Sequence, residues 1–202
     1  MKRGVSILQA CSASLFVTLS YQPVVAAEAN GDARAACSAL AAMSSARFRV
    51  DMAEWVAAGD MGELPAHCRF QVVLDPRESG LENLSYGIGF ELRLPLEWNG
   101  RFLFQGGGGM NGVISPALGT VPGAPSALQR GFAVVSSDGG HRGTSAIDSR
   151  FGVDQQARLD FAYGAVTRTT YEAKALVESY YGRKPEHSYF MGCSTGGREA
   201  ML

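Results

Sequence analysis

The sequence has little excess charge and, after its first 27 residues, no long apolar run. Its 202 residues include 18 Lys and Arg against 19 Asp and Glu, which gives a formal net charge of −1. There is no basic field of the kind that attracts nucleic acid, so we expect no nucleic-acid partner. No segment after residue 27 approaches the length of a transmembrane helix, so we expect no membrane partner either.

Phosphate-binding and metal-binding motifs are also missing. The glycine run Gly106-Gly107-Gly108-Gly109 is not followed by the Gly-Lys-Ser/Thr ending of a P-loop. No second His or Cys is spaced to complete a metal site around Asp138 and His141. The sequence therefore predicts no metal and no cofactor in this chain.

The N-terminus has the pattern of a secretory signal. Lys2 and Arg3 supply the positive start, residues 5–25 are mostly apolar or small, and Val25-Ala26-Ala27 offers small residues for cleavage. We predict that residues 1–27 are a signal peptide and that 28–202 form the mature chain. This places the protein outside the cell or in the periplasm.

Four cysteines are present, and Cys11 would leave with the signal. Export permits disulfides, and we predict a Cys37–Cys68 bond that ties an N-terminal helix to the first strand. Such a bond is worth roughly 3–4 kcal/mol in the chain-entropy model. Cys193 is left over. It is either a buried free thiol or a cysteine whose partner lies beyond residue 202.

The order of the predicted elements indicates an α/β fold. An Ala-rich helix is expected at 32–44 with Asp32 as its cap, and Asp75-Pro76 is expected to end the first strand. Residues 88–94 alternate with period two, which predicts a strand with one buried face. The remaining elements are strands at 70–74, 101–105 and 132–136, a helix at 160–181 ended by Gly182, and a short strand before residue 192. This order suits an α/β-hydrolase sheet that begins with an antiparallel hairpin.

The motif that carries chemistry is Gly192-Cys193-Ser194-Thr195-Gly196, a G-x-S-x-G nucleophile elbow. A short apolar run precedes it and helix-compatible residues follow it, which is the strand–turn–helix setting that the elbow requires. The tight turn leaves no room for side chains two residues before and two after the serine. We interpret Ser194 as the nucleophile; the alternative is a glycine-rich turn with a surface serine.

The glycine run follows a predicted strand, where an α/β-hydrolase places one half of its oxyanion hole. Glycines let the backbone approach a substrate carbonyl and direct N–H groups at it. We therefore expect Gly107 or Gly108 to supply one N–H group and Thr195 the other. Taken alone, the run is also compatible with a flexible loop.

No base is visible in the usual place. In the α/β-hydrolase order the acid and then the histidine follow the serine, but the eight residues after Ser194 include neither Asp nor His. Asp138 and His141 are close in sequence and suggest a dyad. We favour a turn in which Asp138 caps backbone N–H groups and His141 packs nearby. The expectation is a fragment that ends just after the elbow and turns over an ester poorly.

Together these residues resemble the tannase and feruloyl esterase family. The resemblance rests on Gly192-Cys193-Ser194-Thr195-Gly196-Gly197-Arg198, with support from Tyr180-Tyr181-Gly182, Trp98-Asn99-Gly100-Arg101-Phe102 and Asp138-Gly139-Gly140-His141. It implies an α/β-hydrolase core with a large lid and a serine esterase that acts on aromatic-acid esters of the feruloyl or galloyl type. It further implies that Cys193 bonds to a cysteine next to the catalytic histidine, and that a structural calcium lies in the lid. The acid, histidine, second cysteine and lid are absent from this chain.

Two other functions stay open at this point. The elbow does not fix the acyl acceptor, so a serine peptidase or an acyltransferase on the same fold fits the motif as well. A secreted binding protein that kept the fold without catalysis is a third hypothesis.

Overall fold

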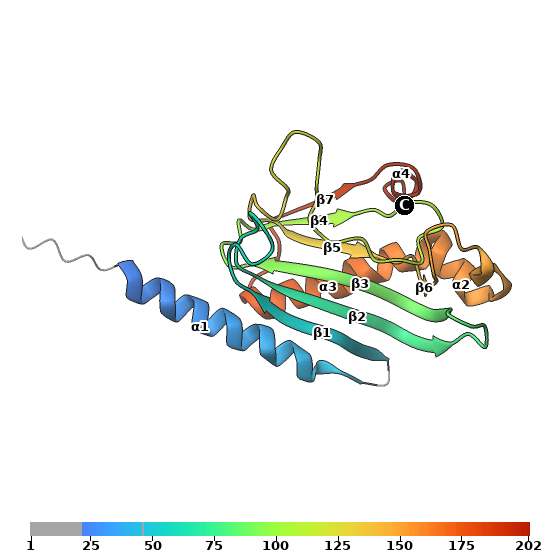
Figure 1. Ribbon diagram of the computed structural model, residues 1–202, viewed down its shortest axis with the longest axis horizontal. Helices are drawn as coiled ribbons and strands as arrows, with labels where there is room; N and C mark the ends of the chain where they lie inside the picture. Colours follow the sequence, from blue (N-terminus) through green and yellow to red (C-terminus); the bar gives the residue numbers. More distant parts are fainter. Residues whose placement is uncertain (1–21, 46) are drawn as a thin grey trace, which may run out of the picture.

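The computed structural model describes residues 22–45 and 47–202, and most of the predicted signal segment, residues 1–21, lies outside them. Its centre is a seven-stranded mixed sheet with the order β1-β2-β3-β5-β4-β7, in which β6 pairs with β3 (Figure 1). The predicted antiparallel start is confirmed, because β1, β2, β3 and β5 run antiparallel, whereas β4 runs parallel to both β5 and β7. The strands are β1 (Phe48–Val56), β2 (His67–Glu78), β3 (Ser85–Pro95), β4 (Arg101–Gln105), β5 (Ala133–Ser137), β6 (His141–Arg142) and β7 (His187–Met191).

Helices flank this sheet, and α3 lies across one of its faces (Figure 1). None of the described helices is long and apolar enough to cross a membrane. They are α1 (Gln22–Leu40), the short η1 (Ala41–Met43) and η2 (Arg150–Val153), α2 (Gln155–Leu159), the π-helical turn η3 (Asp160–Gly164), α3 (Ala165–Tyr181) and α4 (Thr195–Glu199).

The first helix begins earlier than predicted. It starts at Gln22 and continues past Asp32, so Asp32 is not its cap. The reason is that the segment before Asp32 is also rich in alanine, which favours continuation of the helix. The predicted cleavage point before Glu28 falls within this helix.

Strand alternation divides the core between the two faces of the sheet. On β4, Phe102 and Phe104 face α3, while Leu103 faces the opposite side. The face under α3 holds the larger apolar cluster, including Phe70, Phe90, Leu92, Val135, Ala173, Leu176 and Val177. The β4–β5 connection covers the other face with Ala117, Ala127, Leu128 and Phe132. Because β4 and β5 are covered on both sides, the elements that carry the glycine run are rigidly held.

Two expectations about the early strands are wrong. β2 does not end at Asp75-Pro76 but continues to Glu78. The two residues form an irregularity in the pairing with β3, between Leu74 and Arg77, where Asp75 adopts φ 43° and the strand then resumes. β3 is not open to solvent on one face. Glu91 and Arg93, which alternation assigns to the solvent side, are each only 1% exposed because a polar network and loops cover them.

The long helix near the C-terminal end is confirmed in type and in its end point. Gly182 ends α3 in the left-handed conformation with φ 69°. The helical segment begins before residue 160, however, because the side chain of Asp154 accepts a hydrogen bond from Ala157 N and caps α2. A π-helical turn then links α2 to α3.

The predicted Cys37–Cys68 disulfide is present and joins α1 to β2. Both cysteines are buried, and their Cα atoms lie 5.5 Å apart. Tyr180 at the end of α3 also donates a hydrogen bond to Ala33 O, across 3.0 Å. α1 is therefore tied covalently to β2 of the sheet and by a hydrogen bond to α3.

Candidate active site

Ser194 lies in a sharp turn between the end of β7 and the first residue of α4. Its backbone has φ 57° and ψ −124°, a combination that residues other than glycine rarely adopt. Such conformations cost of order 1–3 kcal/mol and gather at functional sites. The side chain is exposed. This is the geometry that the G-x-S-x-G spacing predicts for a nucleophile elbow.

Glycines are required around this turn because three backbone segments touch one another: the end of β7, the start of α4 and the glycine run. A Cβ added at Gly192 would lie 2.3 Å from the carbonyl atoms of Gly196. A Cβ added at Gly196 would lie 2.8 Å from Gly107 O, and one added at Gly106 would lie 2.7 Å from Gly196 Cα. The elbow and the glycine run are therefore in direct backbone contact, as the two halves of an oxyanion hole must be.

The two candidate N–H groups of the glycine run differ in this structure. Gly107 N–H donates to the carboxylate of Glu199 across 2.9 Å, so it is already engaged. Gly108 is exposed, and a Cβ added there would meet nothing within 4 Å, so substrate could approach its backbone. Of the two, Gly108 is the better candidate for the oxyanion donor. Thr195 lies beside the same loop, because its hydroxyl donates to Gly109 O.

The three histidines are placed elsewhere. His67 bonds through its ring to Pro65 O and Arg93, and His187 is exposed at the start of β7. His141 is fully buried and stacked on Phe151, with ring centroids 3.8 Å apart. Its two ring nitrogens have no partner among the described residues, and burial lowers its pKa to about 4.

The turn interpretation of the Asp138-Gly139-Gly140-His141 segment is confirmed. Asp138 Oδ1 accepts hydrogen bonds from Gly89 N and Gly140 N, at 3.0 and 2.9 Å. Burial raises the pKa of Asp138 to about 7, against the opposing effect of those N–H groups. Asp138 thus holds β3 against the end of β5. The side chains of Asp138 and His141 are both buried and stabilise the interior of the fold.

A cleft of about 620 Å³ opens beside the elbow. One wall is formed by the glycine run and the elbow backbone, and the other by the β4–β5 connection. The lining is mostly apolar and includes Pro116, Leu118, Val121, Pro122, Met191 and Cys193. An ester whose carbonyl lies at Ser194 could place an apolar group in this cleft.

Cys193 is exposed and is the one unpaired cysteine among the described residues. The alternative of a buried free thiol is therefore wrong, because the elbow turn directs residue 193 outward. Within the described part of the chain, no group of three His, Cys, Asp or Glu side chains could hold a metal ion.

Comparison with known proteins agrees with this geometry. Residues 77–202, more than half of the chain, match the family described as tannase and feruloyl esterase. The chain belongs to the tannase and feruloyl esterase family. It is 40% identical over 189 residues to a mono(2-hydroxyethyl) terephthalate hydrolase of Piscinibacter sakaiensis, covering 84% of this chain and 31% of that protein. It is also 38% identical over 114 residues to a probable feruloyl esterase B-2 of Aspergillus flavus, covering 55% of this chain and 20% of that protein.

Solved structures of the tannase and feruloyl esterase family show the same fold. The crystal structure of feruloyl esterase B from Aspergillus oryzae superposes with a TM-score of 0.64 at 29% identity, covering 83% of this chain and 33% of that one. The fold is therefore that of the family's α/β-hydrolases, and the chain spans about a third of the length of the relatives it matches.

Arg198, the last residue of the family motif, and Glu199, which follows it, were not predicted to have a role of their own. Arg198 donates to the carbonyl oxygens of Phe161 and Ala162, at 2.9 and 2.6 Å, and so attaches α4 to the π-helical turn. Glu199 is 4% exposed and accepts from Gly107 N and from Asn111 Nδ2, each across 2.9 Å. No local sequence pattern indicates these contacts, because 36 or more residues separate the partners.

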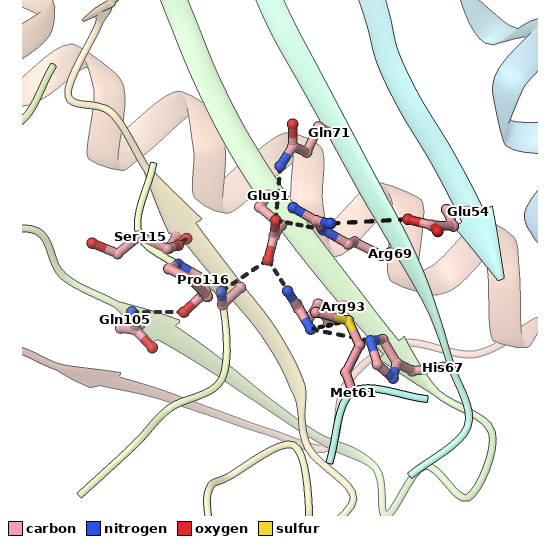
Figure 2. A network of polar contacts seen from close by, with 12 residues as sticks. Glu54, Met61, His67, Arg69, Gln71, Glu91, Arg93, Gln105, Ser115 and Pro116 are labelled. Atoms are coloured by element: carbon pink, nitrogen blue, oxygen red, sulfur yellow. Dashed lines mark hydrogen bonds and ion pairs between the residues drawn. The ribbon is translucent and has the colours of Figure 1, made fainter. Parts of the chain in front are cut away.

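A second polar network holds the outer wall of the cleft (Figure 2). Glu91 Oε1 accepts from Arg93 Nε and from the backbone N–H of Ala117, at 2.6 and 3.0 Å. Glu91 Oε2 accepts from Arg69 and Gln71, at 2.9 and 2.8 Å. Burial alone would raise the pKa of Glu91, but the charge of Arg93 and these hydrogen bonds hold it below its ordinary value. The buried network thus connects β2 and β3 to the connection that lines the cleft.

Proposed function

We propose that this protein is an exported serine carboxylic-ester hydrolase that acts on esters of aromatic acids, of the feruloyl or galloyl type. The observation that carries the proposal is the conformation of Ser194, held at φ 57° in an elbow that packs against the glycine run. Two relatives named for hydrolysis of a terephthalate ester and of feruloyl esters support an aromatic acyl group. The apolar cleft beside Cys193 supports it as well.

The reaction follows from the chemistry of the elbow. Ser194 Oγ attacks the ester carbonyl carbon while a general base takes its proton, and Thr195 N–H and Gly108 N–H stabilise the negative charge on the carbonyl oxygen. The bond to the alcohol then breaks and the alcohol leaves with that proton. Water, activated by the same base, releases the aromatic acid and restores the serine hydroxyl.

The general base and the acid of this reaction have to be supplied by other residues. Since the three histidines are placed elsewhere, we propose that both residues come from a part of the full-length enzyme outside these 202 residues. In this proposal Cys193, exposed beside the nucleophile, bonds to a cysteine next to the catalytic histidine. In the same proposal, a structural calcium lies in the lid that the family resemblance implies.

A fluorophosphonate probe tests the nucleophile directly. In the protein expressed from its complete reading frame, we expect the label on the peptide that contains Ser194, and hydrolysis of methyl ferulate or methyl gallate. Ser194→Ala should lose the label and nearly all activity, leaving a small rate from binding and the oxyanion hole. Ser188→Ala, an exposed serine on β7, is the matched control and should keep both. Label on another serine, or undiminished hydrolysis by Ser194→Ala, would refute the assignment.

Related substrates separate the esterase from the other functions. Hydrolysis of the anilide of the same acid at a rate like that of the ester would favour a peptidase. Product formed on an added alcohol, at the expense of the free acid, would favour an acyltransferase. A wild-type protein that binds the ester without label or turnover would indicate a binding protein.

A further inference from the structure

Glu199 occupies an unusual position for a carboxylate. It is 4% exposed, it lies on the nucleophile helix α4, and both its oxygens point at the loop that follows β4. Burial of a carboxylate is strongly unfavourable unless hydrogen-bond donors compensate it. The compensating donors here are Gly107 N–H and Asn111 Nδ2, while the Arg198 guanidinium stays 4.0 Å away and serves the carbonyls of η3.

The contacts of Glu199 complete a set that joins α4 to the glycine loop. Gly196 N–H donates to Gly107 O across 3.0 Å, and the Thr195 hydroxyl donates to Gly109 O. Glu199 adds Gly107 N–H and the side chain of Asn111. Both the N–H and the C=O of Gly107 are thus fixed by residues that follow the nucleophile.

Fixing Gly107 also fixes the next N–H group. The described residues contain no cis peptide bond, so the Gly108 N–H points opposite to the Gly107 carbonyl within one planar unit. Gly108 itself has no side chain, and the position where a Cβ would lie is open, with no atom within 4 Å. Its direction therefore depends on the two clamped groups of Gly107.

Asn111 shows the constraint that Glu199 imposes. A carboxylate can only accept, so Asn111 must present its NH₂ group to Glu199. Its Oδ1 atom is then left buried without a hydrogen-bond partner among the described residues. Asn111 also holds φ 50° and packs against Gly107 and Gly139, where an added Cβ would lie 2.6 and 2.8 Å from Asn111 atoms. The unsatisfied amide oxygen and the left-handed backbone of Asn111 are both energetically unfavourable. They are consistent with a loop that its other contacts hold tightly in one position.

We propose that Glu199 is a positioning residue for the oxyanion hole: its carboxylate holds the loop from Gly106 to Asn111 at a fixed distance from Ser194. This inference rests on the proposed function, since the loop matters only if Ser194 forms an oxyanion. Glu199 does not touch substrate. It acts through Gly107 on the orientation of Gly108 N–H.

The variants follow from hydrogen-bond chemistry. Glu199→Ala removes both acceptors and frees the loop. Glu199→Gln keeps one acceptor for Gly107 N–H, and its new NH₂ group can donate to Asn111 Oδ1 once that amide turns over. The conservative variant should therefore rescue the loop. Glu199→Asp keeps the charge on a shorter side chain that cannot reach both donors. Glu172→Ala, an exposed glutamate on α3, is the matched control.

The experiment uses the full-length protein, with kcat and KM for methyl ferulate and the rate of fluorophosphonate capture. A misplacement of about 1 Å at a catalytic group can cost about 100-fold. We expect Glu199→Ala to lower kcat and capture by about 10- to 100-fold, with KM little changed. Glu199→Gln should stay near wild type and Glu199→Asp should fall between. Hydrogen exchange at residues 105–112 in a Ser194→Ala background should be faster for Glu199→Ala and unchanged for Glu199→Gln.

The outcomes separate the two proposals. A labelled, active wild type whose kcat is indifferent to Glu199→Ala would overturn the positioning role alone. Equal losses in Glu199→Ala and Glu199→Gln would overturn it too, because charge rather than hydrogen bonding would then matter. A wild type without label at Ser194 would overturn the proposed function, and the positioning role with it. If Glu199→Ala does not fold, Glu199→Asp against Glu199→Gln decides the question by the same measurements.

Discussion

Arg93 Nε donates to Glu91 Oε1 across 2.6 Å, and neither side chain is more than 2% exposed. The two residues lie two positions apart on β3, on the face opposite α3. A buried ion pair of this kind is weak evidence for stability in itself, because removing two charges from water is expensive. Its value here is the position of Glu91, which also accepts from Ala117 N in the wall of the cleft.

We expect Arg93→Met in the full-length protein to lower the free energy of unfolding by about 1.5–3 kcal/mol, because Glu91 would lose the charge-assisted hydrogen bond from Arg93 and keep only the partly exposed Arg69 as a charged partner. Urea unfolding measures this change. Arg47→Ala is the control, because Arg47 pairs with Asp75 at the surface with 86% of its side chain exposed, and such pairs are worth about 1 kcal/mol or less. Equally small losses in the free energy of unfolding for both variants would show that water already solvates the buried network.

Two neighbouring glycines allow a test of the elbow packing. A Cβ added at Gly196 would lie 2.8 Å from Gly107 O, whereas one added at Gly197 would lie 3.8 Å from its nearest neighbour, Gly192 O. We expect Gly196→Ala to push the glycine loop away and to lower kcat by about 100-fold, as a displacement near 1 Å can. Gly197→Ala should fold normally and keep most activity, since alanine also favours helix. Similar kinetics for the two variants would contradict the close contact.

The elbow, β4 and the Cys37–Cys68 bond could be predicted from the sequence because each depends on local or chemically specific signals. A glycine two residues before and two after a serine, a short apolar run, and two cysteines in a chain with a predicted export signal have few alternative interpretations. β4 occupies the predicted residues 101–105, and β5 differs from its prediction by one residue.

The remaining features depend on contacts that sequence patterns do not carry. β1 was not predicted because Arg49, Asp51 and Glu54 interrupt its apolar residues, and its stability comes from pairing with β2. Glu91 and Arg93 alternate like solvent-facing residues, and only the loops that cover β3 make them interior. The contact of Glu199 with Gly107 spans 92 residues, so no local pattern indicates it.

The pKa of Asp138 leads to a pH-dependent effect on stability. Its folded pKa is raised from 3.8 to about 7 by burial, so between these values the folded state holds a proton that the unfolded state releases. The wild type therefore loses stability through Asp138 as pH rises from about 4 to about 7.

Asp138→Asn keeps the acceptor for Gly89 N and Gly140 N and cannot titrate. We expect the stability of Asp138→Asn relative to wild type to increase over this pH range, by an amount on the order of a few kcal/mol. Urea unfolding at several pH values measures the difference, in which the other titrating groups cancel. A difference that does not change with pH would mean that Asp138 is ionised in the folded protein throughout.

The side chain of Gln105 gives the last test, because it joins the end of β4 to the outer wall of the cleft. Gly119 N donates to Gln105 Oε1 across 2.7 Å, and Gln105 Nε2 donates to Pro116 O across 3.1 Å. Gln105→Ala should free this wall while Glu199 still holds the loop from Gly106 to Asn111. Two lost hydrogen bonds of about 1 kcal/mol each correspond to roughly a 10- to 30-fold effect.

We therefore expect Gln105→Ala to raise KM for methyl ferulate by up to that factor and to leave kcat within about threefold, the pattern of lost uniform binding. Gln129→Ala is the matched control, because Gln129 holds the same β4–β5 connection through Ser126 N but does not line the cleft. If Gln105→Ala lowered kcat with KM unchanged, the wall would act on the loop from Gly106 to Asn111 instead of the substrate. If Gln129→Ala raised KM equally, the effect would come from loosening the whole connection, and the cleft beside Cys193 would not be the acyl-binding surface.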